Sequence, residues 1–167
     1  MFQFKPLSYE YFKILFEWLQ CSHVKQWWGP SENWEDFYLR HQKMIVSPLV
    51  FPHIVVLEGE AIGYINYWFV EEDDDFKSIY PPSTVGTDQF IGKRELIGKG
   101  LGSAYVRQFT NELLRRSDIS LVITDPDPSN IAAIRCYEKA GFKKTILKQS
   151  AKGDVQLLEK LKETCEK

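Results

Sequence analysis

Three alternate glycines are the first residues in the sequence whose type and spacing suggest chemistry. Gly98, Gly100 and Gly102 run directly into a helical pattern that begins at Ser103. Because glycine has no Cβ, such a loop can turn its backbone N–H groups inward, beside the unpaired donors and the positive dipole end of the helix. The spacing predicts a loop that holds a phosphate, and a ligand carrying a pyrophosphate is the first hypothesis. Close packing of a strand on a helix is the competing explanation for the same glycines.

Two well-known phosphate loops do not fit this segment. The nucleoside-triphosphate loop has four residues between its first glycine and a Gly-Lys pair, and then Ser or Thr. Here Gly92 and Gly98 enclose five residues, and Lys99 is followed by Gly100. The dinucleotide loop has its third glycine where Ser103 stands, and it normally follows the first strand of its domain. The segment therefore points to another kind of phosphate loop.

The glycine loop lies within a succession of strand patterns. Alternating and short continuous apolar runs predict strands at residues 2–4, 54–57, 61–70, 85–91, 119–124, 142–147 and 154–161. Glu58-Gly59-Glu60 fits the short turn of an antiparallel hairpin. The acidic run 71–75 and the Pro81-Pro82 pair break the pattern. Residues 71–83 are therefore expected to form a long exposed loop.

Helix patterns alternate with the strands. Apolar residues at helical spacing predict a helix early in the chain, one that runs to about Val46, one after the glycine loop, and one over residues 130–140. The pair Trp27-Trp28 is expected near a loop between the first two helices. The expected caps are Ser8, Ser31 and Ser129 at the N-terminal ends and Gly141 at the C-terminal end of the last helix. This order predicts an α+β domain around a mixed sheet.

Length and composition set bounds on the class of protein. With 167 residues, 44% of them apolar, the chain can bury a sizeable core, and we expect a single domain over residues 1–167. No apolar run approaches the roughly 20 residues that span a bilayer, and the N-terminus lacks the layout of a signal peptide. We therefore expect a cytoplasmic protein without a membrane partner.

Charge and metal-binding residue types exclude further classes. The net charge is −2 and the basic residues are scattered, which speaks against nucleic acid as a partner. The three cysteines are too few and too far apart for a disulfide framework, and neither they nor the three histidines have metal-ligand spacing. We expect no metal site and a reducing compartment.

Several further segments extend the pattern that the glycine loop begins. They are His23-x-x-x-Trp27-Trp28-Gly29, Gly59-x-x-Ile62-Gly63-Tyr64, Gly86-Thr87-Asp88-Gln89, Thr124-Asp125-Pro126-x-Pro128-Ser129-Asn130, and the block from Ala133 to Phe142. Together with Gly98–Gly102 they cover most of the chain. The set resembles the GCN5-related N-acetyltransferase (GNAT) superfamily and, within it, the aminoglycoside 6′-N-acetyltransferases. One departure is Ile97, which stands where the coenzyme A loop of the superfamily has Gln or Arg.

The resemblance implies acetyl-CoA as the cofactor, with its phosphates on the glycine loop. It implies a mixed, mostly antiparallel central sheet flanked by helices on both faces. The pantetheine arm would lie between two central strands that splay apart beyond Gln89. The cofactor-binding residues implied in this way are Gln89, Phe90, Ile91, Gly98, Lys99, Gly100, Leu101, Gly102, Ser103, Asn130, Ala133 and Tyr137.

The resemblance also implies where the chemistry occurs. Asp88 and Asp125 would lie in the acceptor site, and Tyr137 would face the cofactor sulfur and protonate the leaving thiolate. Asp88 is expected either to take the proton of the attacking amine or only to orient its ammonium form, and both roles stay open. Cys136 is expected to be a packing thiol, because the family transfers acetyl directly. The predicted substrate-binding residues are Trp27, Trp28, Tyr67, Asp88, Asp125 and Asp127. Asp127 is not typical of the family pattern, and a flat wall against a sugar ring is expected of one tryptophan only.

Acidic residues on the presumed substrate side favour a polycationic small-molecule amine as acceptor. They are the run 71–75 with Asp88, Asp125 and Asp127. The predicted function is acetyl transfer from acetyl-CoA to the 6′-amine of an aminoglycoside, by a monomer or weak dimer. The alternatives are a siderophore (hydroxylysine-type) acyltransferase, a protein-amine acyltransferase, and a noncatalytic acyl-CoA-binding protein.

Overall fold

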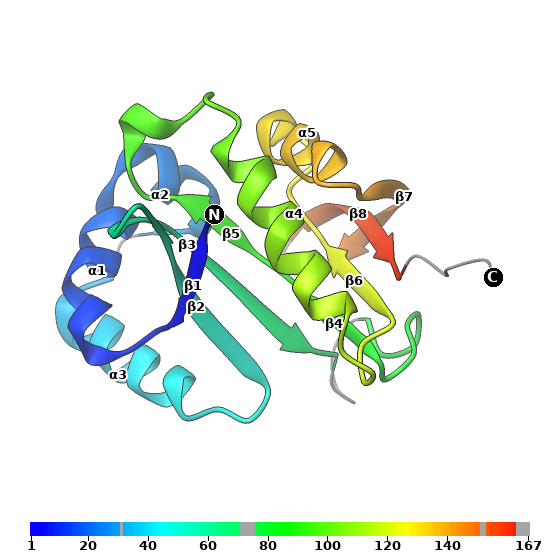
Figure 1. Cartoon of the computed structure of the whole chain (residues 1–167), viewed down its shortest axis with the longest axis horizontal. Coiled ribbons are helices and arrows are strands. Elements are labelled where there is room, and N and C mark those ends of the chain that lie inside the picture. Colours follow the sequence, from blue (N-terminus) through cyan, green and yellow to red (C-terminus); the bar gives the residue numbers. More distant parts are fainter. Residues whose placement is uncertain (31, 71–75, 151–152, 163–167) are drawn as a thin grey trace. The chain divides into compact units, whose positions relative to one another are not determined.

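Strands and helices follow one another along the chain in nearly the order that the sequence patterns predict (Figure 1). The computed structural model describes residues 1–30, 32–70, 76–150 and 153–162. The chain forms two compact units. Unit 1 consists of Met1–Tyr67 and Asp88–Tyr105, and unit 2 of Trp68–Thr87 and Val106–Lys167. The organisation as one domain stays a prediction.

In unit 1, helices are inserted between the first strand and the next. The elements are β1 (Gln3–Pro6), a 3₁₀ turn (Tyr9–Tyr11), α1 (Phe12–Gln20), α2 (Ser22–Trp28), α3 (Trp34–Ile45), β2 (Val50–Leu57), most of β3 (Glu60–Phe69), β5 (Gln89–Ile91), a second 3₁₀ turn (Arg94–Leu96) and the start of α4 (Leu101–Leu114). Strand β1 pairs antiparallel with β2, and β3 pairs antiparallel with β5. Both pairings fit the predicted mostly antiparallel sheet.

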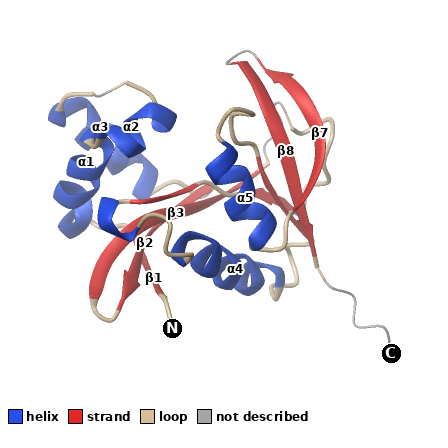
Figure 2. Ribbon diagram, turned by 90° about the horizontal axis from the view of Figure 1, so that it is seen from above, coloured by secondary structure: helices blue, strands red, loops and turns tan. Residues whose placement is uncertain are grey.

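The helices of unit 1 cover one face of its strands (Figure 2). Phe12 of α1 and Phe37 of α3 are buried in one cluster with Ile54 of β2. Because side chains alternate along a strand, Val55 and Ile65 point to the opposite face, and both are fully buried as well. The sheet of unit 1 is therefore covered on both faces.

The hairpin between β2 and β3 is confirmed. Glu58 and Gly59 have φ angles of 51° and 83°. Two central residues with positive φ define the type I′ turn, whose twist matches that of the flanking strands. The turn is short because only two residues separate Leu57 from Glu60.

Unit 2 contains both parallel and antiparallel pairs of strands. Its elements are the end of β3, β4 (Thr84–Gly86), the rest of α4, β6 (Leu121–Thr124), α5 (Ile131–Lys139), β7 (Lys143–Ser150) and β8 (Gly153–Leu161). Strand β6 pairs parallel with β4 and antiparallel with β8, and β8 pairs with β7. Helix α5 packs on the β7–β8 hairpin (Figure 2). The strand order is β1-β2-β3-β4-β6-β8-β7, with β5 paired to β3, which confirms a mixed, mostly antiparallel sheet.

The strand predicted over residues 85–91 is interrupted. It consists of β4 and β5, and pairing of its first part with β6 ends at the hydrogen bond from the Thr87 N–H to the Ile123 carbonyl, 3.0 Å long. The pairing of β4 with β6 thus ends two residues before Gln89. The next N–H, of Asp88, points to the other neighbour, β3, where it donates to the side chain of Asn66.

Residues 76–83 form a loop, as predicted, and most of them are exposed, but two of its aromatic residues are buried. Phe76 and Tyr80 are 7% and 9% exposed and pack with Leu121, Ile123 and Leu157. Two large aromatic side chains can bury enough apolar area to anchor an otherwise irregular segment. The acidic run 71–75 lies outside the described residues.

One predicted N-terminal cap is wrong and another is confirmed in position only. Ser8 stands at the N-cap of the 3₁₀ turn before α1, but its hydroxyl donates to Glu10 and makes no cap bond. Asn130 rather than Ser129 caps α5, accepting from the Ala133 N–H at 3.1 Å, because both adjacent residues have capping side chains and backbone geometry selects one of them. Ser31 lies outside the described residues, and Asn33 caps α3.

The C-terminal cap of α5 is confirmed at Gly141, where φ is 100°. The N–H of Phe142 donates to the Tyr137 carbonyl, and the N–H of Gly141 donates to the Glu138 carbonyl. This pair of bonds is the Schellman motif, which glycine favours because its φ is positive. Among the described residues, no helix has the length and apolar content needed to cross a bilayer.

Candidate active site

The glycine loop has the backbone that a phosphate cradle requires. Gly98 and Gly100 have φ angles of 79° and 78°, and no atom lies within 4 Å of the place where a Cβ would stand on either residue. The Gly100 carbonyl accepts from the Ser103 hydroxyl at 3.0 Å and from the Ala104 N–H at 3.2 Å, which closes the first turn of α4. The first N–H groups of a helix have no acceptor within the helix, so they remain available to an anion.

Residues around the loop differ in exposure. Lys99 is exposed, whereas Gly102 is buried in the first turn of α4. Ile97 is 48% exposed, so an apolar side chain stands in solvent where the family has a polar one. The loop therefore offers backbone donors and one lysine, and it lacks the side-chain contact that Gln or Arg would add.

Strand β5 joins the loop region to the helices of unit 1 through side-chain hydrogen bonds. The buried Tyr105 hydroxyl of α4 donates to the Gln89 side chain. The His23 ring lies 3.0 Å from the Ile91 carbonyl and connects α2 to β5. Tyr105 was missed by the sequence reasoning, because a tyrosine on a helix face is usually read as packing.

Trp28, Tyr64 and Phe90 form an aromatic wall in unit 1. The Trp28 ring stands edge-on to Phe90 at 4.9 Å and to Tyr64 at 5.6 Å, and the rings of Tyr64 and Phe90 stack at 5.4 Å. Trp28 is 38% exposed and Trp27 42%. Phe90, predicted to touch the cofactor, thus has its ring in this wall. Both tryptophans lie at the end of α2, which ends at Trp28, so they are near the connection between two helices, as predicted.

Asp88 lies beside this wall. It is half-buried, and its N–H donates to the Asn66 side chain while its carbonyl accepts from the Asn66 N–H. The Asn66 side chain also donates to the Tyr64 hydroxyl at 3.4 Å. Burial raises the pKa of Tyr64 strongly, and the Asp88 charge raises it further. Tyr64 therefore stays protonated at neutral pH, and the negative charge of Asp88 helps to keep its hydroxyl protonated.

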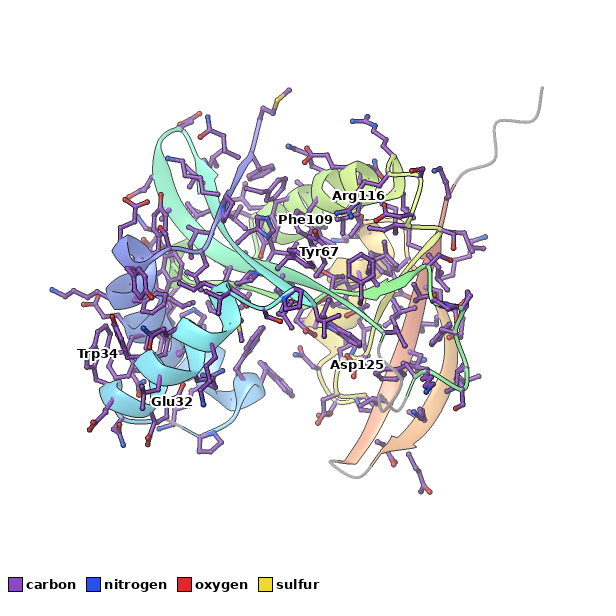
Figure 3. The ribbon with its side chains drawn as sticks, turned by 90° about the horizontal axis from the view of Figure 1, so that it is seen from below. Glu32, Trp34, Tyr67, Phe109, Arg116 and Asp125 are labelled. Atoms are coloured by element: carbon purple, nitrogen blue, oxygen red, sulfur yellow. The ribbon has the colours of Figure 1, made fainter. Side chains whose placement is uncertain are left out.

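Tyr67 is less accessible than a substrate-binding residue is expected to be (Figure 3). It is 7% exposed, and its ring stacks on Phe51 at 4.5 Å with an interplanar angle of 8°. The His53 ring lies 6.1 Å away. The faces of such a ring are used for packing, which leaves the edge and the hydroxyl as the parts with which it can bind a ligand.

Two predicted acceptor-site residues of unit 2, Asp125 and Asp127, lie in the segment that connects β6 to α5. Asp125 is half-buried and directly follows β6 (Figure 3). Asp127 is exposed, and its carboxylate accepts from the N–H and the hydroxyl of Ser129 at 2.7 and 2.5 Å. These bonds lower the pKa of Asp127. They also commit one carboxylate oxygen to the turn before α5, as the Asn130 side chain is committed to its cap.

Tyr137 and Cys136 lie on α5. Tyr137 is 3% exposed, and its ring packs edge-on against Phe142 at 5.4 Å. Burial raises the pKa of the Cys136 thiol to about 11, so the thiol is protonated at neutral pH and is a poor nucleophile. This agrees with a packing role for Cys136. In the parts of the chain that the structure describes, no three His, Cys, Asp or Glu side chains gather as a metal site would require.

Known proteins resemble the chain over most of its length. Aminoglycoside N(6′)-acetyltransferase type 1 of Klebsiella pneumoniae is 36% identical, covering 78% of this chain and 68% of that protein. The crystal structure of aminoglycoside acetyltransferase AAC(6′)-Ib in complex with coenzyme A has a TM-score of 0.90 and 30% identity, covering 96% of this chain and 95% of the other. The same enzyme in complex with coenzyme A and kanamycin gives 0.89 and 29%, with 96% and 95% coverage.

The family follows from a separate comparison. Residues 10–147 match the family described as acetyltransferase (GNAT) domain. That range contains the aromatic wall, Asp88, the glycine loop, Asp125 and α5. The strand order and the backbone of the glycine loop agree with this match. The chain belongs to the GNAT acetyltransferase family.

Proposed function

We propose that the protein transfers the acetyl group of acetyl-CoA to the 6′-amine of an aminoglycoside. The observation that carries the proposal is the pair of positive-φ glycines, Gly98 and Gly100, leading into α4 in a chain 36% identical to an aminoglycoside N(6′)-acetyltransferase. The solved relatives in complex with coenzyme A and kanamycin support both substrates. The proposal includes a monomer or weak dimer acting in the cytoplasm, consistent with the few scattered cysteines.

Acetyl-CoA fits the residues that are present. A Cβ at Gly98 or Gly100 would stand in open space, and the N–H groups of the first turn of α4, which have no acceptor within the helix, are the donors that we assign to the phosphates. Bound there, acetyl-CoA supplies an acetyl group activated as a thioester. We assign the phosphates to Gly98, Lys99, Gly100, Leu101, Gly102 and Ser103, and the rest of the cofactor to Gln89, Phe90, Ile91, Asn130, Ala133 and Tyr137.

The acceptor needs carboxylates and the reaction needs a place for two protons. Asp88 and Asp125 hold ammonium groups of the aminoglycoside, and Trp28 offers a flat wall to a sugar ring. The attacking amine must first lose a proton, either to Asp88 or through water that Asp88 orients. The Tyr137 hydroxyl donates a proton at the sulfur atom that leaves. Trp27, Tyr67 and Asp127 complete the proposed acceptor side.

The proposal is tested by thiol release from acetyl-CoA across a panel of acceptors. The panel contains kanamycin, an aminoglycoside with a hydroxyl at the 6′ position, a linear polyamine, a hydroxylysine-type amine and a peptide. We expect release with kanamycin, an acetyl group at its 6′-nitrogen by mass spectrometry and NMR, and almost none with the 6′-hydroxyl compound. Preferred acetylation of the hydroxylysine-type amine or the peptide would replace the proposal with that alternative. Tight binding of acetyl-CoA without any transfer would indicate a noncatalytic binding protein.

A further inference from the structure

The ladder between β3 and the strand that carries Asp88 is interrupted without a change of register. Ile65 faces Gln89 on one side of the interruption, and Trp68 faces Gly86 on the other. Two residues therefore lie between the two pairs on each strand, 66 and 67 on β3 and 87 and 88 on the other strand, so no residue has been inserted. In a β-bulge, by contrast, two residues on one strand oppose one on the other.

At the interruption, a side-chain oxygen replaces a main-chain oxygen as the acceptor of one hydrogen bond. Residues 62 and 92 belong to a hydrogen-bonded pair, because the Gly92 N–H donates to the Ile62 carbonyl at 2.9 Å. Hydrogen-bonded pairs recur at every second residue of an antiparallel ladder, so Asn66 and Asp88 should exchange both of their main-chain bonds. The Asn66 N–H does donate to the Asp88 carbonyl at 3.0 Å. The Asp88 N–H, however, donates to the Asn66 side-chain oxygen at 2.9 Å.

The Asn66 side chain is held in this position from its other end. Asn66 is 7% exposed, and its amide nitrogen donates to the Tyr64 hydroxyl, which in turn lies 3.7 Å from the Met44 sulfur. Tyr64 is itself fixed by stacking on Phe90. The amide offers its oxygen to the Asp88 N–H and its NH₂ group to the Tyr64 hydroxyl at the same time, which an apolar residue cannot do.

We propose that Asn66 is a positioning residue that sets the direction in which Asp88 is presented to the acceptor amine. By taking the Asp88 N–H with its side chain, it keeps the backbone at residue 88 away from the regular ladder. Asp88 and Asn66 are cross-strand neighbours, so their side chains leave the sheet on one face, together with Tyr64. A substitution at position 66 that removes the side-chain acceptor of the Asp88 N–H therefore changes the direction in which the Asp88 carboxylate points. This inference rests on the proposed function for its catalytic consequence, but not for its geometry.

The geometry is tested directly in the wild-type protein. NMR coupling across the hydrogen bond is measured from the Asp88 amide nitrogen to the carbonyl carbons of Asn66. We expect coupling to the side-chain carbon of Asn66. Coupling to its main-chain carbon would mean a regular ladder and would overturn the inference. The measurement needs neither activity nor a variant.

Variants test the consequence. Asn66→Ala should change the exchange rate of the Asp88 amide hydrogen, because its acceptor is no longer the side-chain oxygen but the main-chain carbonyl of residue 66 or water. It should also lower kcat/KM for kanamycin by about 10- to 100-fold, as for a small misplacement of a reacting group. The dissociation constant for acetyl-CoA should stay unchanged. Asn66→Asp keeps an oxygen in the same place and should restore the wild-type exchange rate of the Asp88 amide. Wild-type exchange and wild-type kcat/KM in a folded Asn66→Ala would overturn the inference.

Asn33→Ala is the matched control. The Asn33 side-chain oxygen also accepts a backbone N–H at 2.9 Å, from Asp36 at the start of α3. Its loss should lower stability, as loss of a helix cap does, and leave kcat/KM for kanamycin unchanged. An equal fall of kcat/KM in both variants would show a general loss of stability and contradict the inference. If the wild-type protein acetylates no aminoglycoside, the proposed function fails, and the coupling and exchange measurements still decide whether Asn66 holds Asp88.

Discussion

The buried ring of Tyr137 gives this residue a packing role, whatever its hydroxyl does. Tyr137→Phe keeps the contact with Phe142 and removes only the proton donor. We expect turnover to fall by about 100-fold, because a positioned acid contributes at least that much, while the denaturation midpoint barely moves. Steady-state kinetics and urea unfolding measure the two effects. Phe142→Leu is the control, since it should lower stability and leave turnover of the folded protein nearly intact. A fully active Tyr137→Phe would leave Tyr137 with the packing role alone.

Asp125 is a half-buried carboxylate that we expect to anchor the acceptor, so its replacement should change KM for the acceptor and not KM for acetyl-CoA. Asp125→Asn should raise KM for kanamycin by roughly tenfold or less, the size expected for a partly exposed ion pair of about 1 kcal/mol. KM for acetyl-CoA should change little. Asp118→Asn is the matched control, because Asp118 is an exposed aspartate paired with Arg116. Equal increases in both KM values after Asp125→Asn would contradict an anchoring role.

Several residues of the candidate site could not be found from the sequence. The glycine loop was recognisable because its backbone demands glycine, and Asp88, Asp125 and Tyr137 because of their motifs. Asn66, by contrast, gives no local signal, since its role depends on which N–H of another strand lies opposite. That information resides in the register of β3 and β5. A buried asparagine in an apolar strand is the only hint, and many buried amides serve packing alone.

The loop before α4 makes a prediction about an element, because its backbone and not its side chains would bind. Gly100→Val should weaken acetyl-CoA binding strongly, since a β-branched residue disfavours the φ of 78° that turns the loop. Calorimetric titration measures the affinity. Gly59→Val is a matched control, with φ of 83° and equally open surroundings in the β2–β3 turn. Both variants should lose similar stability, and only the first should lose affinity. Unchanged affinity in a folded Gly100→Val would refute the cradle.

The packing of α3 makes stability depend on pH. His41 is 3% exposed, its ring lies 2.9 Å from the Phe37 carbonyl, and burial lowers its pKa from 6.5 to about 4. The unfolded chain therefore binds the proton more tightly. The stabilisation is complete above pH 6.5, and up to about 3 kcal/mol is lost as pH falls toward 4. Urea unfolding of wild type and His41→Gln should show a flatter dependence in the variant. Parallel curves would contradict this account.

At the level of elements, periodicity predicted most strands and helices, and short elements were the ones missed. Helix α2 has seven residues, too few for its spacing to stand out beside turn formers. The interruption between β4 and β5 was invisible because residues 85–91 carry no glycine or proline break at position 88. Phe76 and Tyr80 were expected to be exposed with the rest of their loop, because the neighbouring acidic and proline residues dominated the pattern. Tertiary contacts decided these cases.

The charge of the whole molecule bears on how an acceptor approaches. The net charge is only −2, yet the run 71–75 is entirely acidic. Added salt should raise KM for kanamycin, which carries several amines, more than KM for a monoamine acceptor, because screening weakens multiple charge contacts together. Replacing residues 71–75 with Asn and Gln should have a smaller effect than Asp125→Asn, as expected for steering at a distance. A KM for kanamycin that does not change with salt concentration would exclude a polycationic acceptor.

The family and the fold were within reach of the sequence because spaced motifs covered most of the chain, and both predictions are confirmed. The roles of individual residues stay predictions, because a motif fixes residue types and their order but not their hydrogen bonds. Asp127 and Asn130 illustrate this point. Both were predicted to bind ligands, and their side chains make hydrogen bonds in the turn before α5.

The unchanged register around Asn66 has an evolutionary consequence. An interruption made by an inserted residue can be removed only by deleting a codon, and a misplaced deletion would turn every later side chain to the wrong face. Here the interruption depends on a single side chain between two correctly aligned stretches of ladder. One base substitution at codon 66 can therefore reshape the surroundings of Asp88 while the rest of the strand keeps its alignment. Position 66 thus offers selection a short mutational path to a different range of acceptors.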